Sequence, residues 1–124
     1  MSWAFDASRP IFTQITERLT EDILCGRYPP GSRLPSVREL AAEAAVNPNT
    51  VQRALTELEN AGLAVGTRGA GRCVTGDAAV IAEAQRTMAV RLSQEYLQRM
   101  MALGIGAEEI GSILEEIYNG GKTQ

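Results

Sequence analysis

Apolar residues recur at helical spacing in the first part of the chain. Pro10 suits the first position of a helix, because it needs no backbone donor there. Gly26 suits the left-handed residue that ends one. The apolar stripe between them consists of Ile11, Phe12, Ile15, Leu19 and Ile23. The pattern predicts a first helix from Pro10 to about Gly26.

Two further segments with helical spacing follow, joined by a short turn at Ala45-Val46. Ser36 and Glu39 have the spacing of a capping box at the start of the second helix. Asn47 can cap a third helix that has Pro48 at its first position and runs to about Ala61. The apolar positions are Val37, Leu40, Ala41 and Ala44 in the second helix and Val51, Ala54, Leu55 and Leu58 in the third.

The free side of the third helix is polar. It carries Asn49, Arg53, Thr56 and Asn60, with Gln52 beside them. We expect the start of this helix to offer free amides to phosphates as well as side chains to bases. Two short helices joined by a tight turn, the second with a polar free face, are typical of a helix-turn-helix.

Two short β-like stretches come next, at 63–67 and 72–75. The residues between them include Gly69 and Gly71, which permit the positive φ values of a tight turn. From Ala64 to Gly76 there are two arginines, Arg68 and Arg72, and no acid. The stretch predicts a β-hairpin wing that contacts DNA, because narrow minor grooves attract arginine.

The remainder, residues 77–124, predicts two more helices. Asp77 can cap a long helix that reaches about Leu103, and Ala107 begins a last helix that ends at Gly120-Gly121. The apolar positions of residues 77–124 could pack back on the first domain. They form two separate strips, however, which favours contact with a second subunit as well. The residues that we assign to dimerisation are Ile81, Met88, Leu92, Tyr96, Ile110, Ile113, Leu114 and Ile117.

The predicted fold is therefore mainly α. A winged helix-turn-helix, with three helices and a β-hairpin wing, occupies residues 1–76. A short two-helix segment for dimerisation and effector response occupies residues 77–124.

The composition argues against an enzyme, a metal-binding protein and a membrane protein. The chain of 124 residues contains no histidine, which removes the commonest general base and the usual zinc-binding motifs. Its only lysine is Lys122, and Cys25 and Cys73 lack the spacing of a metal site, so we read them as reduced thiols. We expect no catalytic residue, no metal and no cofactor. The start of the chain does not resemble a signal peptide, and no apolar run could span a membrane, so we expect a cytoplasmic protein without a membrane partner.

The net charge of −3 is unusual for a DNA-binding protein, but the charge is unevenly distributed. Residues 1–76 carry eight arginines and eight acids, and residues 77–124 carry four basic residues and seven acids. A local arginine stripe is sufficient for contact with phosphates.

Four stretches in order resemble the GntR family of bacterial regulators, and within it the short YtrA-like branch. They are FDASRPIFTQI at 5–15, GSRLPSVRELA at 31–41, VNPNTVQRALTEL at 46–58 and TRGAGRCV at 67–74. The resemblance implies a homodimer on two-fold symmetric operator DNA, usually a repressor, often of its own operon and of neighbouring transporter genes.

The resemblance also implies which residues contact DNA. Its matched positions are Ser36, Arg38, Asn49, Thr50, Gln52, Arg53, Arg68, Gly69 and Gly71, to which we add Arg33, Asn47 and Arg72. We assign Asn49 and Arg53 to base edges and Thr50 to a phosphate. Pro48 and Gln52 stand where many family members have arginine, and Cys73 where an aromatic residue is common.

Two other functions remain open at this stage. The zero net charge of residues 1–76 is compatible with a winged-helix module that binds proteins rather than DNA. A small enzyme is disfavoured, because the sequence has no histidine, no P-loop and no paired carboxylates. The sequence also leaves open whether a small-molecule effector binds the helical segment.

Overall fold

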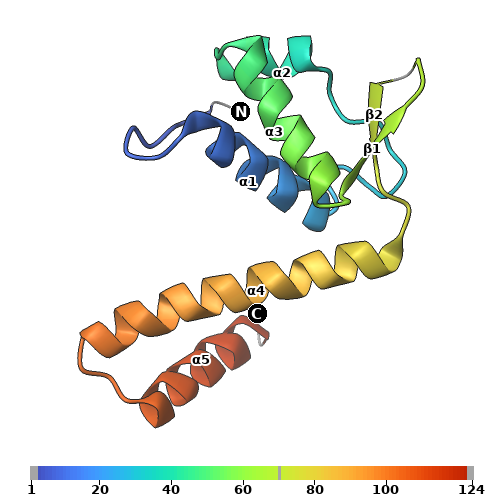
Figure 1. The fold of residues 1–124 in the computed structure, drawn as a ribbon. Coiled ribbons are helices and arrows are strands. Elements are labelled where there is room, and N and C mark those ends of the chain that lie inside the picture. Colours follow the sequence, from blue (N-terminus) through green and yellow to red (C-terminus); the bar gives the residue numbers. More distant parts are fainter. Residues whose placement is uncertain (1–2, 70, 123–124) are drawn as a thin grey trace. The chain divides into compact units, whose positions relative to one another are not determined.

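Five helices and one antiparallel hairpin make up the part of the chain that the computed structural model describes, residues 3–69 and 71–122 (Figure 1). The elements are α1 (Ile11–Leu24), α2 (Val37–Ala44), α3 (Pro48–Asn60), β1 (Ala64–Thr67), β2 (Gly71–Val74), α4 (Ala78–Ala102) and α5 (Ala107–Lys122). The predicted fold class is confirmed. The chain divides into two units, Met1–Gln85 and Arg86–Gln124, and α4 begins in the first and ends in the second.

The core of the first unit is built from the apolar stripes that the sequence shows. Each stripe of α1, α2 and α3 faces inward because its residues recur every three or four positions. The hairpin closes one end of this core with Ala64 and Val74, and Leu34 joins from the loop before α2. The most buried side chains are Ile15, Leu19, Leu40, Val51, Ala54, Leu55 and Leu58. This packing fixes α3 against α1 and α2 and leaves its opposite side exposed.

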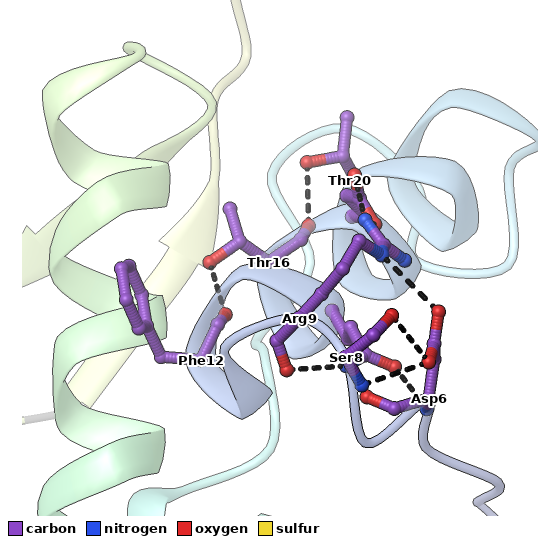
Figure 2. A network of polar contacts seen from close by, with 8 residues as sticks. Asp6, Ser8, Arg9, Phe12, Thr16 and Thr20 are labelled. Atoms are coloured by element: carbon purple, nitrogen blue, oxygen red, sulfur yellow. Dashed lines mark hydrogen bonds and ion pairs between the residues drawn. The ribbon is translucent and has the colours of Figure 1, made fainter.

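The segment before α1 takes over the role of a helix cap (Figure 2). Pro10 is the N-cap residue and makes no side-chain capping bond. Gln14 instead reaches back: its Nε2 donates to the carbonyl oxygens of Asp6 at 2.7 Å and Arg9 at 3.0 Å, and its Oε1 accepts from the Asp6 amide at 2.8 Å. Arg9 also pairs with Glu17 at 3.0 Å. These bonds hold the entry of the chain to the first turns of α1.

The hairpin has a third neighbour that the sequence pattern did not predict. Within it, Gly66 faces Arg72 and Thr67 faces Gly71. On the other edge of β2, the amide of Leu34 donates to the carbonyl of Arg72 at 2.9 Å, and the amide of Val74 donates to that of Ser32 at 2.8 Å. Residues 31–34 therefore extend the ladder and stabilise the base of the wing.

The first turns of α4 belong to the first unit. Val80, Ile81 and Ala84 pack against its core. Gln85 donates from Nε2 to the carbonyl oxygen of Leu24 at the end of α1, at 3.2 Å. The start of α4 is thus anchored to the first unit, with Asp77 capping it through a 2.9 Å bond from the Ala79 amide.

The second unit comprises the rest of α4 together with α5. Ile110 is its buried residue, with 2% of its surface exposed. A groove of about 410 Å³ is lined by Leu92, Ser93, Tyr96, Leu97 and Leu114. The expected end of the last helix at Gly120-Gly121 is wrong, since α5 continues to Lys122. Neither glycine has a positive φ, and glycine within a helix costs only about 1 kcal/mol relative to alanine.

In the part of the chain that is described, no helix combines the length and apolar character that crossing a membrane requires.

Candidate nucleic-acid interface

The turn between α2 and α3 has the tight geometry of a helix-turn-helix. Ala45 closes α2 in the left-handed conformation, with φ 56° and ψ 48°. The amide of Val46 donates to the carbonyl of Ala41 at 3.1 Å. Asn47 then begins the next helix, so two residues suffice to redirect the chain. This sharp reversal brings the starts of α2 and α3 to defined positions on one fold.

The start of α2 is fixed by the predicted capping box. The Glu39 amide donates to Ser36 Oγ at 3.0 Å, and the Ser36 amide donates to Glu39 Oε1 at 3.2 Å. The backbone amide of Ser36, followed by its side chain, bonds the Glu39 carboxylate and holds the pKa of Glu39 below its ordinary value of 4.5, and the nearby Arg33 acts in the same direction. Arg38 lies in this first turn with its side chain exposed. The cap thus presents an arginine beside a helix start, where anions bind well.

The start of α3 is capped as predicted. Asn47 Oδ1 accepts from the Asn49 amide at 2.8 Å, and Pro48 occupies the first turn. The Thr50 amide donates to the Asn47 carbonyl at 3.0 Å. The expectation of free amides at this helix start is therefore wrong for Asn49 and Thr50. Side chains, rather than amides, are what this end offers to a partner.

The exposed face of α3 is polar. Asn49, Gln52 and Thr56 follow one another at helical spacing, and all three are exposed. The hydroxyl of Thr56 donates to the carbonyl of Gln52 at 2.9 Å, so it is already bonded within the helix. The face therefore presents the amide donors and acceptors of Asn49 and Gln52. These are the groups that read base edges in a major groove.

Arg53 lies at the edge of this face that adjoins α1. Its guanidinium carbon is 3.7 Å from the centre of the Phe12 ring, which is a close cation–π contact. Figure 2 shows Phe12 pointing from α1 towards α3. The sequence predicted Arg53 on the free face, but its partner on another helix was not visible in the sequence.

The wing presents one arginine outward and turns the other inward. Arg68 is exposed next to Gly69, which has a φ of 78° that favours glycine. Arg72 is held: its Nε lies 2.6 Å from Oε1 of Glu59 on α3. Within residues 3–69 and 71–122, Arg38 and Arg68 form no ion pair with a carboxylate. Their charges remain available to a phosphate backbone.

The other assigned DNA-binding residues lie on the same elements. Arg33, Asn47 and Gly71 are exposed, and Ser36 and Thr50 are half-buried. Arg33 also forms an isolated bridge to Cys73 through its backbone, which leaves its side chain outside the ladder. The first unit thus brings the assigned residues onto α2, α3, the preceding loop and the wing.

The residues assigned to dimerisation are divided by the structure. Leu92, Tyr96, Leu114 and Ile117 are exposed apolar or aromatic side chains of the second unit. Met88 and Ile113 are half-buried. The remaining two have partners in their own chain, since Ile81 packs on the core of the first unit and Ile110 is buried. Apolar exposure beyond the assigned set occurs at Leu97, Met101 and Tyr118.

The arrangement of α2, α3 and wing matches a known family. The model of the bacterial regulatory proteins of the gntR family matches residues 12–74, from the first turn of α1 to the end of β2. The chain belongs to the gntR family. Its similarity to the YtrA-like branch is also confirmed, because the HTH-type transcriptional repressor YtrA of Bacillus subtilis (strain 168) is 35% identical over 120 residues, covering 94% of this chain and 92% of YtrA.

Solved structures support the same assignment. A GntR family transcriptional regulator from Listeria monocytogenes is 38% identical, with a TM-score of 0.83 over 90% of this chain and 98% of that one. The DNA-binding domain of AraR, solved in complex with operator ORX1, shares the fold at 23% identity and a TM-score of 0.56, over 60% of this chain and 95% of that one. This GntR chain is a DNA-binding transcriptional regulator.

Proposed function

We propose that this GntR chain is a homodimeric repressor that binds a two-fold symmetric operator. The observation that carries the proposal is the exposed polar face of α3 together with the exposed side chains of Arg38 and Arg68, which form no ion pair within residues 3–69 and 71–122. Such a surface combines groups that read bases with charges that neutralise phosphates. A protein-binding module would not need both base-reading groups and phosphate-neutralising charges.

In this proposal α3 enters the major groove. Asn49 and Gln52 are both exposed on this helix, and an amide side chain can bond an adenine edge at two points. Arg53 lies at the margin, so it reaches the outermost base edges or the adjoining backbone. Thr50 is assigned to a phosphate at the start of the helix.

The flanking elements contact the DNA backbone and the adjacent groove. Arg38, at the start of α2, binds a phosphate or a guanine with its two-pronged guanidinium. Arg68, at the wing tip, enters a narrow minor groove. Gly69 and Gly71 permit close approach of the hairpin backbone. The supporting contacts are assigned to Arg33, Ser36 and Asn47.

The second unit supplies the dimer contact. Leu92 is 50% exposed and Ile117 is 64% exposed, which is a large apolar exposure for so small a unit. Pairing with a second copy would bury these side chains and present two recognition helices to successive major grooves, about 34 Å apart. This geometry favours an operator with two half-sites.

Repression follows from occupation of the operator. The relative YtrA is described as a repressor, which supports this sign of control. We place the protein in the cytoplasm, where bacterial operators lie, and assign it no enzymatic reaction. The target includes its own operon and, by the resemblance, transporter genes. An effector that changes the relation between two subunits would weaken binding to both half-sites together.

Selection from random DNA tests the proposal. A pool of random-sequence duplexes is enriched for binding to the full chain at moderate salt, and the survivors are sequenced. We expect an inverted repeat with half-sites about one helical turn apart. The Asn49→Ala, Gln52→Ala double variant should enrich no such repeat, whereas the Gln94→Ala variant, changed at an exposed position of α4, should enrich it unchanged. A wild-type chain that enriches no sequence would overturn the proposal.

A further inference from the structure

The outer half of the wing is held to α3 by one ion pair. We infer that Glu59 and Arg72 act as a clasp that sets the wing relative to the recognition helix, and that Arg72 contributes to operator binding by positioning Arg68 rather than by touching DNA. The inference rests on the proposed DNA-binding function of the first unit.

The geometry of the pair is close and partly enclosed. Arg72 Nε donates to Glu59 Oε1 at 2.6 Å, and the side chains are 19% and 35% exposed. Partial burial reduces the solvent screening that makes fully exposed pairs weak. The bond joins residues 13 positions apart, one on α3 and one on β2. It therefore connects β2 to α3 through side chains.

The Glu59 carboxylate also lies against β1. Its Oε2 is 3.5 Å from the position that a Cβ on Gly66 would occupy. Gly66 faces Arg72 across the hairpin. One carboxylate of the recognition helix thus contacts both strands of the wing at the same level.

Among residues 64–69 and 71–74 of the wing, burial is confined to the base of the hairpin. Ala64 is the buried residue of β1, and the following three residues of that strand are exposed. The Thr67 hydroxyl contacts Cys73 Sγ at 3.6 Å, but this contact stays within the hairpin. On the other edge of β2, residues 31–34 pair with the hairpin up to the level of Arg72, but they belong to the loop before α2 and not to α3. The ion pair is therefore the side-chain bond that ties this level of the hairpin to α3.

The clasp lies next to the arginine that it positions. Arg68 comes two residues after Gly66, which is about 7 Å along an extended strand. A change of hairpin direction at Gly66 and Arg72 would displace Arg68 relative to α3. Loss of the pair would thus weaken a DNA contact made by another residue.

Removal of the acid distinguishes positioning from direct contact. Glu59→Gln removes a negative charge from α3, and simple electrostatics predicts tighter binding to DNA. The clasp predicts weaker binding to a duplex enriched by the wild-type chain, by roughly 3- to 10-fold. Glu57→Gln removes the same charge from an exposed position of the same helix and should bind as tightly as the wild type or slightly more tightly.

Exchange of the charges of Glu59 and Arg72 provides a second test of the clasp. Arg72→Glu alone should weaken binding by about 10-fold or more, and the double variant Glu59→Arg, Arg72→Glu should recover to within about 3-fold of the wild type. If Arg72 touches phosphate directly, the exchanged variant stays as weak as Arg72→Glu, and Glu59→Gln does not weaken binding. Either of these results would overturn the clasp.

Hydrogen exchange of the free chain separates this inference from the proposed function. The amides of the hairpin should exchange faster in Glu59→Gln than in Glu57→Gln or the wild type, at equal melting temperature. This measurement needs no DNA, so it tests the clasp even if the wild-type chain selects no operator. Equal exchange in all three proteins would contradict the clasp and leave the proposed function untouched.

Discussion

Ala45 lies in the turn between α2 and α3, and its backbone conformation sets the direction of α3. It is the non-glycine residue with positive φ in the described chain, 3–69 and 71–122. The left-handed conformation brings Cβ close to the backbone and costs an L-residue about 1–2 kcal/mol. The core contacts of α2 and α3 offset this strain and hold the turn. The short turn is thus maintained by packing rather than by the preference of its own residue.

Replacement of Ala45 by glycine should therefore stabilise the protein. We expect Ala45→Gly to raise the free energy of unfolding by about 0.5–1 kcal/mol, because relief of strain exceeds the greater entropy of glycine in the unfolded chain. Urea unfolding at neutral pH measures the change. Ala61→Gly is the matched control: Ala61 ends α3 with φ −79°, so glycine there should lower stability. Destabilisation by Ala45→Gly would show that the turn is not strained.

At the scale of the elements, helix caps fix the conformation of the first turns of α2 and α3. Ser36 and Glu39 fix the start of α2, and Asn47 fixes the start of α3. Both caps belong to the two helices that present side chains proposed to bind DNA. Loss of a cap frays the first turn, which is where Arg38 and Asn49 lie. Stability and operator binding are therefore coupled at these two positions.

The capping box of α2 predicts a dependence of stability on pH. The pKa of Glu39 is lower in the folded protein than its ordinary value of 4.5. The carboxylate therefore stabilises the fold at pH above 4.5, and this contribution is lost as the pH falls through the lowered pKa.

Ser36→Ala should remove the cap and weaken that dependence. At neutral pH we expect the variant to be less stable by about 1 kcal/mol in free energy of unfolding. Between about pH 6 and pH 3 it should lose slightly less stability than the wild type, because the Glu39 carboxylate loses the Ser36 hydroxyl and keeps the backbone amide of residue 36 as its partner. Denaturant unfolding across this range is the measurement. Parallel curves for the two proteins would show that the Ser36 hydroxyl carries no such linkage.

Elements that are formed by residues close together in the sequence were predictable. The three helices of the first unit, the caps of α2 and α3 and the hairpin follow from periodicity, capping residues, proline and glycine within a few positions, whereas the bonds of Gln14 at the start of α1 do not. The pairing of residues 31–34 with β2 was not predictable, because its hydrogen bonds join segments about 40 residues apart. The same reason applies to two site residues: Phe12 lies under Arg53, and Glu59 binds Arg72, each across a distance that no local pattern encodes.

At the scale of the whole molecule, the two units expose different kinds of side chains. The first carries the polar and arginine surface, and the second carries exposed apolar side chains on α4 and α5. On α5, Leu114 and Ile117 lie on one side, and Ser112, Glu115 and Glu116 lie on the other. The apolar side is the one that the proposed dimer would bury.

A charge on that side should separate the subunits. We expect Leu114→Glu to shift the protein from dimer to monomer, because a carboxylate buried in an apolar interface without a partner is costly. Ser112→Glu adds the same charge to the opposite side of α5 and should remain dimeric. Sedimentation equilibrium gives the mass of each. A wild-type monomer, or a dimer unaffected by Leu114→Glu, would contradict the proposed interface.

Operator binding itself is tested most directly by an equilibrium titration of the full chain with two duplexes of identical composition. One is enriched by the chain from random DNA, and the other is its shuffled sequence; each is measured at two salt concentrations. We predict at least about a 1,000-fold tighter affinity for the enriched duplex, two chains bound per duplex, and weaker binding to both duplexes at higher salt. Equal affinity for the two duplexes, or an affinity that does not change with salt, would contradict recognition of an operator through α3 and the arginine surface.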